Sequence, residues 1–337
     1  MALRNHSSIP AATAARVRKV ADQLGYQPDP ALSALAAYRF GLKIARDYSV
    51  IALVSNWRTS EWPRHPGARR ILEGASARGR AYGYTVQNFW AREAGMTPRR
   101  FGDVLAARGI RGVILAPFER HTDEFELDFE RFTVVTIERP AKYPYFHHVV
   151  PNYFADTMEA WRQIADRGYR RVGLVINREY AERSAHQWEA AHEYQQSRSV
   201  PAADRIPTLV VPASGRVDVV RAWLRRHRPQ VVLSRSSLVF AAAAAEGLAI
   251  PRDLGYVSLN ALDDAERNVS GILQHRDLMG ATAIDLLNSL LHHNHRGPHD
   301  LPLATQVNGT WSDGRTLSAT GRRRREGAGQ TATASSR

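Results

Sequence analysis

The stretch SVIALVS at residues 49–55 decides the fold class of this chain of 337 residues. It carries five consecutive apolar side chains between two serines, with no alternation of polar and apolar positions. A strand covered on one face alternates, whereas a strand of a parallel sheet is covered on both faces and gives a continuous apolar run. The stretch therefore predicts a buried parallel strand in a sheet that carries helices on both faces.

Downstream of residue 55, short apolar runs alternate with longer segments whose apolar residues recur every three or four positions. This alternation predicts βαβ units with right-handed crossovers, and two successive series of units predict two similar α/β lobes. We expect strands at residues 84–89, 112–115, 133–137, 172–176, 208–211, 231–234 and 255–259. We expect helices at residues 68–82, 98–108, 154–167, 185–198, 216–227 and 238–247.

Basic residues are concentrated at the two ends of the sequence, which has a formal net charge of +13. Residues 1–46 hold seven Lys and Arg and two Asp, and residues 321–337 hold five Arg and one Glu. A basic end can release counterions from a nucleic-acid backbone, or it can simply keep the protein in solution, and charge alone does not choose between the two. Residues 11–24 and 31–38 have helical patterns, and residues 321–337 have the composition of a disordered tail.

Several classes of protein are disfavoured by what the sequence lacks. It has no cysteine, which excludes disulfides and thiolate metal sites and fits a reducing cytoplasm. We recognise no secretory signal and no apolar run long enough for a membrane span, so we expect a cytoplasmic protein without a membrane partner. We also find no nucleophile elbow, phosphate-binding loop or HExxH motif, and therefore expect neither an enzyme nor a cofactor.

The segment HHNHRGPH at residues 292–299 is rich in histidine, and neutral imidazoles bind zinc or nickel. No acidic residue lies close by before Asp300, and the segment has the pattern of a helix end that runs into a loop. We therefore interpret it as a solvated surface, with metal binding as the alternative.

Six short stretches occur in an order and at spacings that are specific only when taken together. They are IPAAT at residues 9–13, GYQP at 25–28, ALSALA at 31–36, RGYRRVGL at 167–174, GLAIPRDL at 247–254 and GTWSDGRT at 309–316. On these stretches the chain resembles the lactose-repressor (LacI/GalR) family of bacterial transcription regulators, from residue 2 to about residue 316.

The resemblance implies three parts and two kinds of partner. Residues 1–46 would form a partial helix-turn-helix head with a hinge helix, and residues 47–320 a two-lobed sensor domain like type I periplasmic binding proteins. The lobes would be joined by crossings near residues 152–157, 274–278 and 305–310, and residues 321–337 would be the basic tail. The family implies a homodimer that binds double-stranded operator DNA and a small-molecule effector, which lies in the cleft between the lobes.

The resemblance to the DNA-binding head is only partial. Residue 1 aligns with the end of the family's recognition helix, so the base-reading side chains are missing from this sequence. Either the start codon is misassigned, which we favour because the next helix and the hinge are in good order, or specific DNA binding has been lost. Leu35 matches a family leucine that wedges between base pairs, although leucines of this segment could also pack on a neighbouring helix.

The DNA-binding candidates fall into two groups. Those for phosphate contact, which could equally belong to a solvated helix surface, are Thr13, Arg16 and Tyr26. Those in the hinge helix are Leu32, Leu35 and Ala36.

Candidate effector contacts follow the ends of expected strands or lie at the expected crossings. Sugar-like ligands are held by planar amide and carboxylate groups together with an aromatic ring, and the set contains both kinds. Asn260 and Gln274 match effector positions of the family, whereas Trp188 stands where many members have an Arg, which disfavours an acidic or strongly hydroxylated ligand of the kind that this Arg holds. The candidates are Ser55, Trp57, Glu138, Asn152, Tyr153, Trp188, Ser234, Asn260 and Gln274.

The sequence thus predicts a DNA-binding transcription regulator, expected to be a repressor, that is controlled by a small-molecule effector resembling a sugar. The alternative is a cytoplasmic ligand sensor that has lost specific DNA binding. A sugar-processing enzyme would need paired catalytic carboxylates, and the sequence reveals none.

Overall fold

The computed structural model describes residues 50–142, 144–212, 214–262 and 267–318, together with Pro10, Thr13, Ala15, Arg16 and Val20. The chain divides into two units, Met1–Tyr48 and Ser49–Arg337. In the first unit, Thr13 and Arg16 are helical and exposed. The other DNA-binding candidates and the expected tail lie outside the described residues, namely Tyr26, Leu32, Leu35, Ala36 and residues 321–337.

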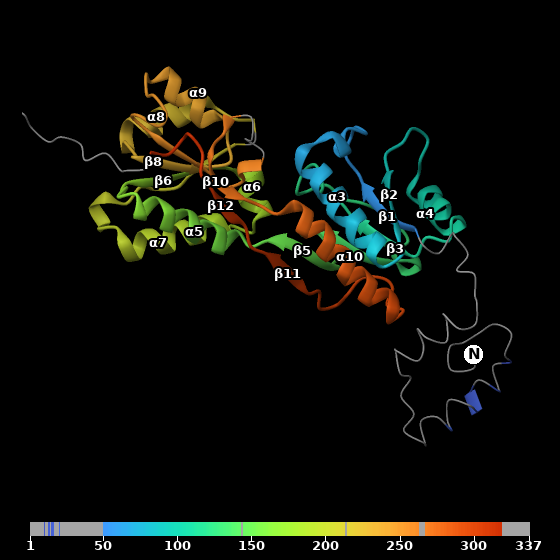
Figure 1. The fold of residues 1–337 in the computed structure, drawn as a ribbon. Coiled ribbons are helices and arrows are strands. Elements are labelled where there is room, and N and C mark those ends of the chain that lie inside the picture. The colour runs from blue at the N-terminus through green and yellow to red at the C-terminus, as the bar shows by residue number, and fades with distance from the viewer. Residues whose placement is uncertain are drawn as a thin grey trace, which may run out of the picture. The chain divides into compact units, whose positions relative to one another are not determined.

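The second unit contains two six-stranded sheets, which form the cores of two lobes (Figure 1). The first lobe has the strand order β11-β5-β4-β3-β1-β2 and the second has the order β12-β10-β9-β8-β6-β7. All neighbouring strands are parallel except β10 and β12. The strands are β1 (Val50–Ser55), β2 (Thr85–Trp90), β3 (Gly112–Leu115), β4 (Thr133–Ile137), β5 (His147–Pro151), β6 (Val172–Asn177), β7 (Leu209–Val211), β8 (Val231–Ser234), β9 (Gly255–Ser258), β10 (Ser270–Leu273), β11 (Ala304–Val307) and β12 (Thr310–Ser312). The predicted class, α/β with two lobes built on parallel sheets, is confirmed.

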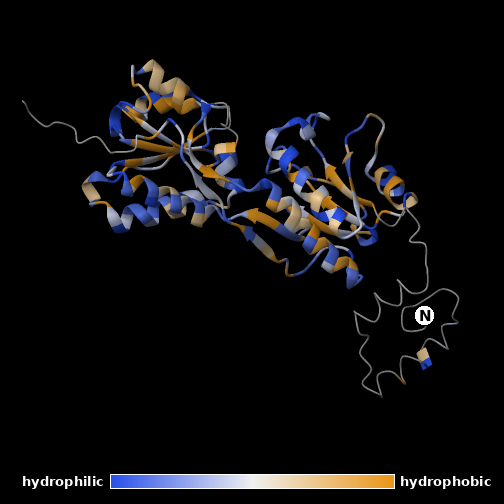
Figure 2. Cartoon of the chain, in the orientation of Figure 1, coloured by the Kyte–Doolittle hydropathy of each residue, from blue (hydrophilic) through white to orange (hydrophobic). Residues whose placement is uncertain are grey.

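Helices cover both faces of each sheet, and the central strands β1 and β3 of the first lobe are among the most hydrophobic segments of the unit (Figure 2). On β1, Ile51 and Leu53 join one core cluster while Ala52 and Val54 join another, which explains the unbroken apolar run. The helices are α3 (Pro66–Ala81), α4 (Pro98–Ala107), α5 (Tyr153–Asp166), α6 (Arg178–Arg183), α7 (Gln187–Ser199), α8 (Val217–His227), α9 (Leu238–Ala245) and α10 (Arg276–His292), with short 3-10 turns at Trp62–Arg64, Phe129–Arg131 and Ala202–Asp204.

The prediction of one helix over residues 185–198 was wrong at its start. Ala185 and His186 have φ angles of 51° and 60°, and this left-handed pair separates α6 from α7. The sequence analysis also predicted no strand at His147–Pro151, where β5 lies. β5 begins with two histidines, so it lacks the continuous apolar run by which the other strands were predicted.

The chain passes between the lobes three times, and the crossings are hydrogen-bonded to one another. They lie between β5 and α5, between β10 and α10, and between β11 and β12. The backbone N–H of Asn152 donates to the carbonyl oxygen of Val307 over 2.9 Å, and the Asn152 side chain donates to Asn308 over 2.9 Å. The N–H of Gly309 donates to the Asp156 carboxylate over 2.7 Å. The first and third crossings are therefore joined by hydrogen bonds of both backbone and side chains.

The return crossing is anchored by a close contact between α3 and α10. A Cβ atom on Gly280 would lie 2.2 Å from the carbonyl oxygen of Ile71, and one on Gly74 would lie 1.8 Å from that of Asp277. Real Cβ atoms do not approach backbone this closely, so only glycine allows the two helices to pack at this distance. The contact attaches α10, which follows the last parallel strand of the second lobe, to the first lobe.

We predict that Gly280→Ala lowers the free energy of unfolding by about 1–3 kcal/mol, because the added methyl group forces the two helices apart. Urea unfolding measures the loss. Gly67→Ala, in the same helix pair, is the matched control, since its Cβ would meet nothing closer than 3.5 Å. Equal losses in the two variants would contradict the close packing of α3 on α10.

Candidate functional site

A cleft between the lobes is the candidate site. Its walls come from both lobes. Open parallel sheets bind ligands beyond the carboxyl ends of their strands, and the cleft includes residues that directly follow β1, β3, β4 and β8. The lining residues are Trp57, Trp62, His65, Gly67, Ala68, Ile71, Pro117, Phe118, Glu119 and Glu138 from the first lobe, Tyr180, Arg183 and Arg235 from the second, and Arg276 at the start of α10.

Glu138 lies at the centre of the charged part of the cleft. It directly follows β4 with a φ angle of 66°, a left-handed conformation that costs a side-chain-bearing residue about 1–3 kcal/mol. Its N–H donates to the carbonyl oxygen of Val149 over 2.8 Å, and its carbonyl oxygen accepts from the Thr136 hydroxyl over 2.9 Å. These two bonds hold the backbone in the conformation that directs the carboxylate away from the strand.

The Glu138 carboxylate bridges two guanidinium groups. One oxygen accepts from Arg183 over 2.7 Å, and the other accepts from Arg276 over 2.9 Å. All three side chains are at most 8% exposed. Burial by itself would raise the pKa of Glu138, but the two guanidiniums outweigh burial and lower it to about 2. The carboxylate is therefore charged at any physiological pH.

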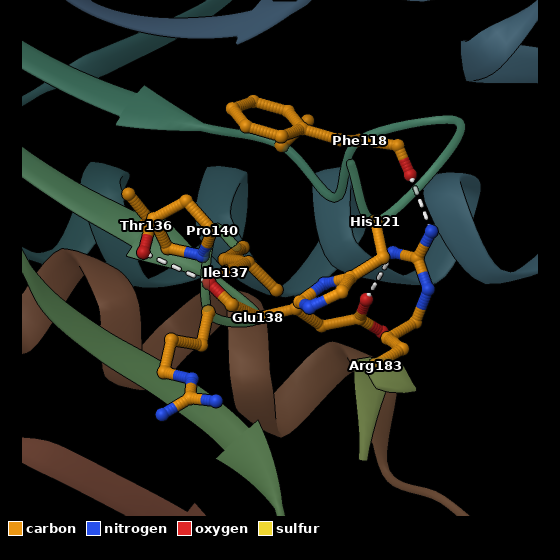
Figure 3. Close-up of a pocket in the computed structure, with 9 residues that line it drawn as sticks. Phe118, His121, Thr136, Ile137, Glu138, Pro140 and Arg183 are labelled. Carbon is orange, nitrogen blue, oxygen red and sulfur yellow. Dashed lines mark hydrogen bonds and ion pairs between the residues drawn. The ribbon is translucent and has the colours of Figure 1, made fainter. Parts of the chain in front are cut away.

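Arg183 connects the second lobe to the first. From the last turn of α6 it donates to the carbonyl oxygen of Phe118 over 3.0 Å, in addition to its bond with Glu138. Figure 3 shows its guanidinium reaching into a smaller cavity of the first lobe, beside Phe118 and His121. Burial and the nearby Arg183 charge lower the pKa of His121. The Arg183 side chain thus fills a position in this cavity that a polar group of a ligand could otherwise occupy.

Aromatic rings form the rest of the walls. On the first lobe, the Trp57 indole N–H donates to the carbonyl oxygen of Pro117 over 2.9 Å, which holds the ring at the cleft. On the second lobe, the Arg235 guanidinium lies 3.9 Å from the centre of the Tyr180 ring and 5.9 Å from the Trp188 ring. The cleft therefore combines flat apolar surfaces with charged groups.

Polar atoms are buried without partners at the carboxyl edges of both sheets. The Ser55 hydroxyl, both amide atoms of Asn260 and the indole N–H of Trp188 have no hydrogen-bond partner among the described residues. All three side chains are 1% exposed. Leaving such a group unsatisfied costs about 1–3 kcal/mol, so sites of this kind call for a ligand or ordered water.

The sequence-predicted effector residues have different local roles. Trp57 and Glu138 line the cleft. Ser55, Tyr153, Trp188, Asn260 and Gln274 are buried at the carboxyl edges or crossings, and Gln274 accepts from Arg276 over 2.9 Å.

Two further candidates, Asn152 and Ser234, are bonded to backbone. Asn152 caps α5 by accepting from the N–H of Ala155 over 3.2 Å. The Ser234 hydroxyl donates to the carbonyl oxygen of Val175 over 2.6 Å.

The sequence analysis did not find Tyr180, Arg183 and Arg276 among the lining residues. Tyr180 and Arg183 belong to α6, a helix that was not predicted, and its local signals were the N-cap residue Asn177 and the i, i+4 pair of Glu179 with Arg183. Arg276 is two residues beyond the predicted Gln274. Its role depends on Glu138, which is 138 positions away in the sequence.

Asp156 is a buried carboxyl group at the crossings. One oxygen accepts from the N–H of Gly309, and the other has no partner among the described residues. Burial raises the pKa of Asp156 to about 6, although the bond from Gly309 opposes the shift. Within the described part of the chain, no group of three or more His, Cys, Asp or Glu side chains is placed to hold a metal ion. No helix there combines the length and apolarity needed to cross a membrane.

Comparisons with known proteins agree with this architecture. Residues 161–309 match the family model of the periplasmic binding protein-like domain. No curated protein matches the chain. Among solved structures, the complex of the transcriptional regulator CelR with cellobiose is 17% identical, with a TM-score of 0.61 and 94% of both chains covered.

Two other solved structures show the same fold. A protein from Rhizobium etli assigned to the LacI family of regulators is 17% identical, with a TM-score of 0.62 over 80% of this chain and 99% of that one. The dimeric Lac repressor is 14% identical, with a TM-score of 0.56 over 80% and 99%. The chain therefore contains a periplasmic-binding-protein-like domain, and the structures that share its two-lobed fold include transcription regulators of the LacI type.

We predict that Glu138→Gln lowers the free energy of unfolding by about 3–5 kcal/mol, because it removes the carboxylate that pairs with the buried Arg276 and leaves the buried Arg183 with Glu179 alone. Chemical denaturation measures the loss. Glu61→Gln is the matched control, since it breaks an exposed pair with Arg64 and should change stability by less than about 1 kcal/mol. Similar small losses in both variants would show that the buried bridge does not hold the lobes.

Proposed function

We propose that this protein is a DNA-binding transcription regulator, a repressor, controlled by a small neutral polyhydroxylated molecule that binds between the lobes. One observation carries the proposal. The buried polar atoms of Ser55, Trp188 and Asn260, at the carboxyl edges of the two sheets, have no partner among the described residues. None of the three lines the cleft as it stands, so a ligand with several hydroxyl groups would reach their polar atoms by entering between the lobes beyond its present walls.

The chemistry of the site favours a neutral ligand. The charges of Arg183 and Arg276 are already balanced by Glu138 and Glu179, and the unpartnered atoms are an amide, a hydroxyl and an indole N–H. The hydroxyl and the amide supply both donors and acceptors and the indole N–H supplies a donor, so together they can bond sugar hydroxyls, which donate and accept. The Trp57 ring offers a surface for the apolar face of a sugar ring. The fold shared with the CelR–cellobiose complex supports a carbohydrate as the class of effector.

The predicted effector residues then divide by role. We propose that Ser55, Trp57, Trp188 and Asn260 contact the ligand. Buried residues nearby would shape and polarise the site, namely Glu138, Tyr153 and Gln274. The two backbone-bonded side chains would position the strand ends and crossings, namely Asn152 and Ser234.

Regulation would follow from the two-lobed architecture. A ligand that binds both lobes favours one angle between them, and this population shift is transmitted through the paired crossings at Asn152 and Gly309. In our proposal the hinge helix responds by docking on operator DNA as a homodimer, with Leu35 as the wedge and Leu32 and Ala36 beside it. Thr13, Arg16 and Tyr26 would contact phosphates. Likeness in fold to the dimeric Lac repressor supports this assembly.

We predict that a neutral mono- or disaccharide, with cellobiose as the first probe, raises the thermal midpoint of the full chain and that Asn260→Leu abolishes this rise. The leucine removes both amide atoms that we expect to bond the ligand. Asn88→Leu, at an exposed position of β2, should respond like the wild type. If no neutral sugar raises the midpoint, or if Asn260→Leu responds as the wild type does, the assignment of the cleft is wrong.

We predict that the chain, extended at its N-terminus by the missing part of a helix-turn-helix, enriches a specific sequence from a pool of random 30-base-pair duplexes, and that Leu35→Ala in this extended chain weakens binding of that sequence at least tenfold, or about 1.4 kcal/mol. Fluorescence anisotropy measures the affinity. Leu301→Ala, which truncates a leucine that is 86% exposed, is the control. Sugar binding without any enriched sequence would instead identify a ligand sensor without specific DNA binding.

A further inference from the structure

Three imidazole rings form a stack at the amino ends of the strands in the first lobe, the edge opposite the cleft. The His147 and His299 ring centres are 3.7 Å apart with the rings 19° from parallel. The His299 and His295 centres are 4.0 Å apart with the rings at 26°. His147 is the first residue of β5, whereas the other two follow α10. Residues nearly 150 positions apart in the sequence thus meet face to face.

The stack is connected to the start of β11. The backbone N–H of Leu303 donates to the ring Nδ1 of His147 over 3.1 Å, and the N–H of His148 donates to the carbonyl oxygen of Leu303 over 2.9 Å. An imidazole nitrogen that accepts a hydrogen bond carries no proton, so the His147 ring must be neutral in this arrangement. Protonation at Nδ1 would place two N–H groups against each other and remove the bond to Leu303.

Backbone bonds keep the stacked residues in place. The N–H of Gly297 donates to the carbonyl oxygen of Phe132 over 3.0 Å, and the N–H of His299 donates to that of Tyr145 over 3.0 Å. The Thr133 hydroxyl donates to the carbonyl oxygen of His295 over 2.6 Å. Because the backbone is held at these points, the rings cannot separate easily when one of them gains a charge.

Few charges of opposite sign are available to stabilise a protonated ring. Among the described residues, neither His147 nor His299 forms an ion pair with a carboxylate. The nearest elements carry Glu130, whose carboxylate lies against Gly297, and the exposed Arg296 and Asp300. Burial and the neighbouring imidazoles lower the pKa of His299 to about 4. Burial, His295 and His148 lower the pKa of His147 in the same way.

We propose that the histidine stack is a proton-sensitive latch that holds residues 293–303, and with them the start of β11, against β5 while the rings are neutral. β11 leads directly to the crossing at Asn308 and Gly309, so opening the latch would loosen one of the three connections between the lobes. The rings meet by their faces, and their in-plane lone pairs do not converge on a common point, so the arrangement suits proton sensing and not metal binding. The latch would make the sensor domain respond to pH independently of its effector.

The direction of the effect follows from linkage. A histidine whose pKa is lower in the folded than in the unfolded protein favours folding when neutral. Its stabilising effect is complete above about pH 6.5, the unfolded value, and is lost as the pH falls toward the folded value, which for His299 is about 4. Asp156 titrates near pH 6 with the opposite sign, because its raised pKa favours the folded state when it is protonated. The test must therefore compare variants that all retain Asp156.

Ring titration by nitrogen-detected NMR on the full chain tests the latch. We expect His147 to titrate below pH 6.5 in the wild type and to move upward by at least half a pH unit in His299→Ala. We also expect protection of the Leu303 amide against hydrogen exchange, corrected for the intrinsic rate, to fall at least tenfold between pH 7.5 and pH 5. His293→Ala, an exposed histidine of the same segment outside the stack, should leave both quantities unchanged.

A second variant keeps the test decisive if His299→Ala disturbs folding. His299→Phe retains a stacking ring that cannot be protonated, so the thermal midpoint should fall less between pH 7.5 and pH 5 than in the wild type. Wild-type titration of His147 at or above pH 6.5, or an equal fall of the midpoint in His299→Phe and the wild type, would overturn the proposal.

Discussion

A buried negative charge needs positive partners at close range, and Glu138 obtains them from different parts of the chain. Arg183 belongs to the second lobe and Arg276 to the helix that returns to the first. Removal of any one of these three side chains would leave a buried, poorly solvated charge on a remaining side chain. Glu138 and Arg276 both lie in the first lobe, so a change in the angle between the lobes that separates Arg183 from Glu138 must replace this one contact by water or by a ligand.

The region between the lobes has two kinds of polar group, and they suit different tasks. The charged groups satisfy one another, so they are suited to setting the angle between the lobes. The neutral groups at Ser55, Asn260 and Trp188 are left without partners, so they are suited to recognition. A ligand could thus bind without paying to break the Glu138 bridge, provided that its hydroxyl groups reach both sheet edges.

Parts of the site could be predicted because the fold obeys local rules. Trp57 and Glu138 were found because ligands lie beyond the carboxyl ends of parallel strands, and those ends are visible as the limits of apolar runs. Arg183 was missed because its helix is short and begins directly after β6. The start of α7 was misplaced because two side-chain-bearing residues adopt left-handed conformations, which no propensity predicts.

The sequence by itself determined the two α/β lobes. A strand that is buried on both faces is a nearly continuous run of apolar residues, and such a run can be recognised directly in the sequence. It also determined the basic ends and the exclusion of disulfides, which depend only on composition. The tertiary structure alone decided that Glu138 meets Arg183 and Arg276, that Asn260 is buried without a partner, and that His147 stacks on His299. These contacts join residues that are far apart in the sequence. Their energies depend on the distance between the groups and on their burial in the folded chain, and neither quantity can be predicted from the pattern of residues along the sequence.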